Sequence, residues 1–168
     1  MKAARVVAAI VVALALQTTL ASFVIRGSAA LDLALIVVVY FALRSGPVTG
    51  LLAGTLAGLI QDALSSGVLG IGGLSKTVVG FLAGVVGTQF IVTAPLPRFV
   101  VFFLATVLHA AVFMGLYVLL DLRSFPEPYA AVLGQGVGNG FVGVVLFQLI
   151  DWLPGIAERR RARRPLKR

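Results

Sequence analysis

The sequence has no cysteine, a single histidine and few charged residues. The absence of cysteine excludes disulfides, thiolate metal ligands and a cysteine nucleophile. Charged residues make up only 12% of the chain, whereas 60% is hydrophobic and the mean hydropathy is +1.06. Soluble domains carry about 25% charged residues, and a chain of 168 residues leaves too much surface exposed to hide this much apolar material. We therefore expect a lipid bilayer to surround most of the chain.

The scarcity of ionisable side chains also argues against catalysis and cofactor binding. Six acidic residues are scattered along the chain, and no predicted helix carries two of them three or four positions apart. A metal site needs several such ligands at helical spacing. His109 has no obvious serine or acid companion for a hydrolase triad. The glycine-rich stretch at 134–140 lies inside an apolar run with no preceding strand, so it is no nucleotide loop. No enzyme, metal or cofactor is indicated.

What the sequence does have is a series of apolar runs, most of them near the roughly 20 residues that a membrane span needs. The first is interpreted as a retained span and not a cleaved signal peptide, because it continues past any small-residue cleavage site. The second is short unless Asp32 lies at the membrane interface. Prolines 95 and 97 are expected to stop the fourth run, and residues 151–154 to close the sixth. The predicted spans are 6–25, 31–43, 47–64, 73–92, 98–120 and 130–150.

The fold class is therefore predicted as all-α, a polytopic membrane protein with six transmembrane helices in one domain, residues 1–157. A basic tail at 158–168 follows it. Six spans place both termini on one side. Cytoplasmic termini put eleven positive residues inside and two, Arg26 and Arg123, outside, so the positive-inside rule favours this orientation. The tail is expected to contact anionic lipid headgroups. Without an aromatic platform, nucleic-acid binding is not favoured.

Glycines recur at spacings typical of close helix packing in membranes. Gly54, Gly58 and Asp62 share a face of the third predicted span, so Asp62 is expected to point into the bundle. The glycines predicted to let helix backbones approach are Gly50, Gly54, Gly58, Gly136 and Gly140.

Two charges, Asp62 and Lys76, flank the glycine-rich connector at 65–73 and lie at similar depth in the outer part of the membrane. An ion there must pair or reach water. Two interpretations stay open: a structural pair or interfacial charges, and a polar site that binds a partner or small ligand. His109 and Asn139 are each expected to hydrogen-bond between helices. Gln61 joins Asp62, Lys76 and Asn139 as a candidate buried polar or partner-binding residue.

Residues 31–87 resemble the MreD family of bacterial rod shape-determining membrane proteins. Asp32-Leu33 matches the family's start of the second span, although Leu31 replaces the usual proline. Asp62 matches the acidic residue that ends the glycine-rich third span, and residues 67–70 match its connector. Gly73 to Gly87 matches the fourth span. Residues 1–30 and 88–168 match in hydropathy alone, and Lys76 and Asn139 map to no family motif.

The resemblance implies a non-enzymatic subunit of the cell-elongation machinery in the bacterial inner membrane, which helps to position peptidoglycan synthesis. It implies an MreC-like single-span partner, with MreB, RodA and the elongation transpeptidase as further partners. The family's bundle is similar to the substrate-binding subunits of energy-coupling-factor transporters. The alternative is therefore a small-molecule uptake subunit, for which the candidate ligand residues would be Gln61, Asp62, Lys76, Tyr117 and Asn139. The connector at 65–73 and the polar loop at 121–129 form the predicted outer docking face.

Overall fold

A computed structural model describes residues 2–23, 31–65, 67–90, 92–125 and 128–162 of the chain. Side chains are described for residues 3–19 and, within those ranges, from 31 to 152. The seven positive charges of the predicted basic tail lie outside the described side chains, as does Arg26.

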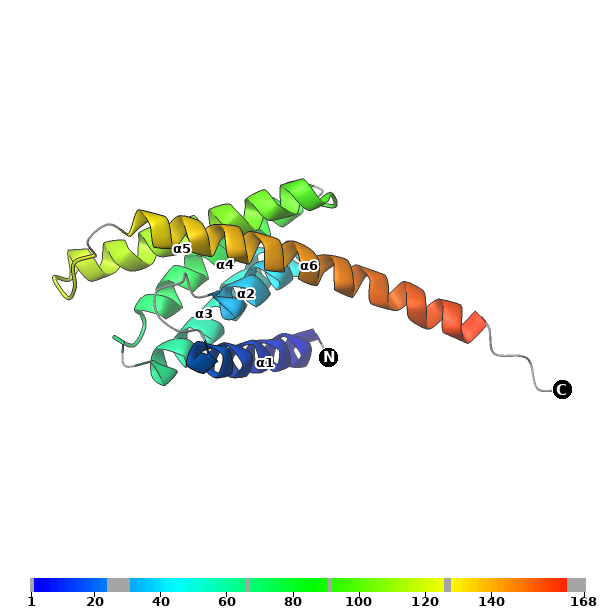
Figure 1. Cartoon of the computed structure of the whole chain (residues 1–168), viewed down its shortest axis with the longest axis horizontal. Coiled ribbons are helices and arrows are strands. Elements are labelled where there is room, and N and C mark those ends of the chain that lie inside the picture. The colour runs from blue at the N-terminus through cyan, green and yellow to red at the C-terminus, as the bar shows by residue number, and fades with distance from the viewer. Residues whose placement is uncertain (1, 24–30, 66, 91, 126–127, 163–168) are drawn as a thin grey trace.

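The described residues form six helices and no strand, which confirms an all-α fold. The helices are α1 (Lys2–Phe23), α2 (Leu33–Ser45), α3 (Pro47–Leu64), α4 (Ile71–Gln89), α5 (Pro95–Leu119) and α6 (Tyr129–Ala162). Successive helices run back and forth along the bundle, and α6 extends beyond the other helices (Figure 1). The first turn of α1 and the C-terminal part of α6 therefore lie toward the same end.

Four of the described helices, α3, α4, α5 and the part of α6 up to Trp152, are long and apolar enough to cross a membrane. In α1 the side chains are described for Ala3–Thr19 alone, which is shorter than 18 residues, and the whole of α2 is shorter still. The count of six spans thus stays a prediction for these two helices.

Several predicted boundaries were wrong, and each has a local cause. The fourth helix does end before the prolines, at Gln89, but α5 begins at Pro95 and not at Arg98, because proline fits the first helical turn, where its missing N–H has no intrahelical partner. Residues 151–154 do not close α6, which continues to Ala162. The residues that follow Pro154 are mostly strong helix formers.

Helix α2 lies at the centre of the bundle, and seven of its thirteen residues are buried. One face packs on α1 and α3 through Ala34 and Val38. The other packs on α4, α5 and α6 through Leu35 and Val39. Such a helix, apolar all round, is typical of a fully enclosed position.

Helices α3 and α4 approach closely at glycine positions. A Cβ atom on Gly50 would overlap the carbonyl oxygen of Gly80, and one on Gly54 would overlap that of Lys76. A Cβ atom on Gly58 would likewise overlap the backbone of Gly72 and Gly73. These three glycines of α3 thus lie where its backbone comes closest to that of α4.

The glycines of α6 play a related role against aromatic side chains. A Cβ atom on Gly136 would lie 2.9 Å from the ring of Phe103, and one on Gly140 would lie 2.7 Å from the ring of Phe99. Small residues on α6 thus make room for two phenylalanines of α5.

Candidate functional site

A buried ion pair lies in the part of the bundle next to the start of α2. The Nζ atom of Lys76 in α4 donates to Oδ2 of Asp32, which caps α2, at 2.6 Å. Lys76 is 2% exposed and Asp32 4% exposed. Asp32 is therefore enclosed by protein at the start of α2. Lys76 pairs with Asp32 and makes no ion pair with Asp62 among the described contacts.

The ion pair belongs to a wider polar network that joins four helices. The Nε2 atom of His109 in α5 lies 3.2 Å from Nζ of Lys76 and 3.6 Å from Oδ2 of Asp32. Asn139 in α6 accepts a hydrogen bond from the backbone N–H of Asp32 and donates one to Oγ1 of Thr106, both at 3.1 Å. The expected interhelical hydrogen bonds of His109 and Asn139 are confirmed.

Asp62, at the same end of the bundle, bonds to backbone amides and not to a charged side chain. Its Oδ2 atom accepts from the backbone N–H groups of Gly70 at 2.9 Å and Gly73 at 3.1 Å. These amides belong to the free N–H groups that any helix presents at its start. Asp62 is 7% exposed, so it faces protein as expected, and it ties the end of α3 to the first turn of α4. The Oε1 atom of neighbouring Gln61 is buried and has no partner among the described residues.

The two connectors at this end meet through Tyr117. The backbone N–H of Val68, in the α3–α4 connector, donates to the Tyr117 hydroxyl at 3.3 Å. The ring of Phe125, in the α5–α6 connector, lies edge-on to the Tyr117 ring at 5.9 Å. The described parts of both connectors, residues 65–70 and 120–128 with gaps at 66 and 126–127, therefore form one surface, which we call the connector surface. Exposed apolar side chains on and beside it are Val68, Leu69, Leu119, Leu120, Leu122 and Tyr129.

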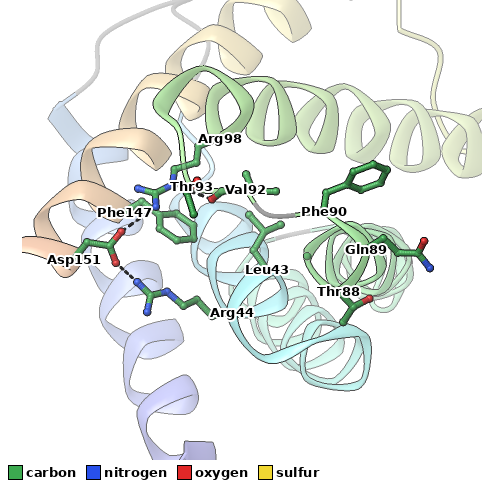
Figure 2. Close-up of a pocket in the computed structure, with 11 residues that line it drawn as sticks. Leu43, Arg44, Thr88, Gln89, Phe90, Val92, Thr93, Arg98, Phe147 and Asp151 are labelled. Atoms are coloured by element: carbon green, nitrogen blue, oxygen red, sulfur yellow. Dashed lines mark hydrogen bonds and ion pairs between the residues drawn. The ribbon is translucent and has the colours of Figure 1, made fainter.

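A second charged cluster lies at the opposite end. Arg44 at the end of α2 and Arg98 in the first turn of α5 both donate to Asp151 of α6, the latter at 2.9 Å (Figure 2). Both guanidinium groups also lie over the ring of Phe147, that of Arg98 at 4.4 Å from its centre. Sequence reasoning missed this cluster. The available signal was that Arg44, Arg98 and Asp151 all flank helix ends on one predicted side of the membrane.

Comparison with known protein families matches residues 2–150 to MreD, the rod shape-determining protein. The chain belongs to the MreD family. Comparisons with curated proteins and with solved structures found no match. The MreD match extends well beyond residues 31–87, on which the resemblance was first recognised, and it covers all but the last part of α6.

The residues that carried the MreD resemblance occupy structural positions in the fold. Asp32 caps α2 and pairs with Lys76, Asp62 caps α4, and the connector at 67–70 provides Gly70 at a φ of +103°. Glycine reaches this left-handed conformation without strain. Within the described residues, no three His, Cys, Asp or Glu side chains gather as a metal site would require. For this member of the MreD family, the polar residues found from sequence mainly hold helices in register.

Proposed function

We propose that this MreD-family protein is a non-enzymatic subunit of the cell-elongation complex in the bacterial inner membrane. It spans the membrane six times with both termini in the cytoplasm. It binds an MreC-like single-span partner and helps to position peptidoglycan synthesis, with MreB, RodA and the elongation transpeptidase as further partners. The family match and the apolar helices support a rod shape-determining membrane protein. The partner and the orientation are the steps that we add.

The connector surface is the observation that best supports partner binding. Leu69 is 67% exposed, Leu119 80% and Tyr129 76%, and all three flank connectors at the same end of the bundle. Apolar side chains gathered outside the helices are typical of interaction sites. The Tyr117 side chain contacts both connectors, through a hydrogen bond from the backbone of Val68 and a ring contact with Phe125. In the proposed orientation this surface lies on the outer side of the membrane. The outer domain of an MreC-like protein lies on the same side.

The glycine faces of α3 are not part of the proposed partner surface. Gly54 and Gly58 already pack on the backbone of α4, so this face of α3 is not open to another membrane protein. The partner is therefore assigned to the connectors and not to this helix face.

The contacts of the buried polar residues do not favour the alternative function, a small-molecule uptake subunit. Lys76 and Asn139 are almost completely buried, and their polar atoms are engaged with Asp32 and Thr106. Asp62 is committed to backbone amides. A ligand would have to break these bonds, and each group left unpaired would cost about 1–3 kcal/mol.

Co-purification with an MreC-like partner tests the proposal. Leu69→Glu and Leu122→Glu place a charge on the connector surface, and each should reduce the recovered partner by about tenfold, as expected for an interface contact worth somewhat over 1 kcal/mol. Leu96→Glu is the matched control, because Leu96 is 72% exposed at the opposite end of the bundle.

The recovery of partner by the three variants decides the outcome. Unchanged recovery with both connector variants, or an equal loss with Leu96→Glu, would remove the connector surface from the proposal. A vitamin-like molecule that co-purified at equal stoichiometry would revive the uptake alternative.

A further inference from the structure

A cavity of about 480 Å³ adjoins the arginine cluster at the end of the bundle opposite the connector surface. It lies between the ends of α2 and α4, the connector residues 90, 92 and 93, the start of α5, and α6 (Figure 2). We call it the arginine pocket. Its polar lining comes from Arg44, Thr88, Gln89, Thr93, Arg98 and Asp151.

The charges in the arginine pocket do not balance. Arg44 and Arg98 share a single carboxylate, Asp151. Among the side chains that the structure describes, no other acidic residue lines the pocket, so one positive charge is left over. Arg98 is 8% exposed, and the Arg44 side chain is 46% exposed. One guanidinium is thus anchored inside the pocket and the other is open to an incoming anion.

An apolar groove begins one helical turn deeper. It encloses about 130 Å³ between α4 and α5, and its lining is entirely aliphatic: Val79, Leu82, Ala83, Val86, Val101, Leu104, Ala105 and Leu108. Val86 precedes Gly87 of the arginine pocket, and Val101 lies one turn after Arg98. The polar pocket and the apolar groove therefore follow one another along the same pair of helices.

We propose that the arginine pocket and the groove together bind one anionic phospholipid. The phosphate of its headgroup is held by Arg44 and Arg98, and the start of one acyl chain lies in the groove between α4 and α5. Guanidinium groups match phosphate oxygens in both charge and geometry. The pocket lies at the ends of apolar helices, which is the depth of lipid headgroups. Basic pockets between helices are a known mode of headgroup recognition.

The groove decides between a phospholipid and a free phosphate. An inorganic phosphate would use the arginines alone and would leave the aliphatic groove without a role. A phospholipid can occupy both the arginine pocket and the groove, because its charged headgroup is joined to an apolar acyl chain in the same order as the pocket is followed by the groove. The inference is independent of which protein partner binds the connector surface.

Native mass spectrometry of the full chain, purified in detergent and mixed with phosphatidylglycerol or phosphatidylcholine, tests the proposal. Wild type should retain phosphatidylglycerol in preference, at one molecule per chain. Arg44→Gln should weaken this retention by about tenfold, as expected for one charge-assisted hydrogen bond. Val101→Phe, which fills the groove and leaves both arginines in place, should weaken the retention of both lipids.

Arg5→Gln is the matched control. Arg5 is exposed on α1 and does not line the arginine pocket, although it and Arg44 both line a neighbouring cavity, so this variant removes a nearby positive charge that the proposal does not use. Thermal unfolding of each variant verifies that it is folded, and Arg44 is chosen over the buried Arg98 for this reason. Equal retention of the two lipids by wild type, or an equal loss with Arg5→Gln, would overturn the proposal. Displacement of the lipid by millimolar inorganic phosphate, with Val101→Phe unaffected, would assign the site to free phosphate and contradict it.

Discussion

Each buried charge whose side chain the structure describes is matched by a specific group. Lys76 has Asp32, and Asp62 has two backbone amides. Transfer of an unpaired ion into a membrane is costly, so a bundle that retains such residues must bring their partners to them. The ion pair bridges 44 positions of sequence and holds the start of α2 against α4.

Removal of one charge of the Lys76–Asp32 ion pair should lower the stability of the protein more than removal of both charges. Lys76→Met leaves the Asp32 carboxylate buried and unpaired, and we expect a loss of about 3–5 kcal/mol in the free energy of unfolding. The double variant Asp32→Asn with Lys76→Met should recover much of that loss. Thermal unfolding in detergent, arranged as a double-mutant cycle, measures the difference. Additive losses would show that the two side chains are not coupled.

Asp62 should act through the backbone of α4. Asp62→Leu removes the acceptor of the Gly70 and Gly73 amides, and a loss of about 1–2 kcal/mol is expected for a lost helix cap. Asp62→Asn keeps one oxygen and should lose less. Hydrogen exchange at the start of α4 should rise in the order wild type, Asn, Leu. Unchanged exchange in Asp62→Leu would contradict the capping role.

At the scale of helices, α3 and α4 can pack closely because the glycines of α3 at their contact have no side chains. Backbone atoms of α4 occupy the positions where Cβ atoms on three glycines of α3 would lie. In lipid, close packing of this kind replaces much of the hydrophobic driving force that water would supply. The α3–α4 pair thus forms the rigid frame on which the Asp62 cap and the connector are built.

Gly54→Val should force α3 and α4 apart, because the carbonyl of Lys76 cannot yield without moving the helix. A loss of about 1–3 kcal/mol, typical of overpacking, is expected in unfolding experiments. Gly115→Ala in α5 is the control, since its Cβ atom would meet nothing within 4 Å. It should leave stability unchanged or raise it slightly, because alanine favours the helix. Equal losses in both variants would argue against a backbone contact at Gly54.

At the scale of the whole molecule, the back-and-forth course of the helices produces two chemically distinct ends. One end has the connector surface with its exposed apolar side chains, and the other has the arginine pocket. In the orientation that we propose from the positive-inside bias, the arginine pocket lies at the cytoplasmic face. Protein partners and lipid are thus assigned to opposite ends of one small bundle.

Accessibility of single cysteines tests this orientation without background labelling, because the chain has no cysteine of its own. Ser124→Cys, on the connector surface, should react with a membrane-impermeant maleimide on intact spheroplasts. Ser45→Cys, at the arginine end, should react only after lysis. Both positions are exposed. The reverse pattern would invert the proposed topology, and equal labelling of the two would contradict a spanning bundle.

The sequence alone determined the helical class, the approximate extent of five of the six described helices, and the protein-facing position of Asp62. Composition and glycine spacing are local properties, and the expense of exposing charge to hydrocarbon is strong enough to place Asp62 in the interior. The MreD resemblance likewise rested on residues near one another in sequence. For the sixth helix, the apolar run did not reveal that the helix continues through Pro154 to Ala162.

Only the tertiary structure decided which polar groups meet. Asp62 and Lys76 lie 14 positions apart and were natural partners by sequence, yet Asp62 is nearer to the free amides of α4, and Lys76 reaches Asp32 on α2. The arginine pocket joins residues 44, 98 and 151, which no local pattern connects. The hydropathy of the sequence indicates which residues form each apolar helix and where along that helix a residue lies. Which neighbouring helix it faces depends on how side-chain volumes from all six helices pack together.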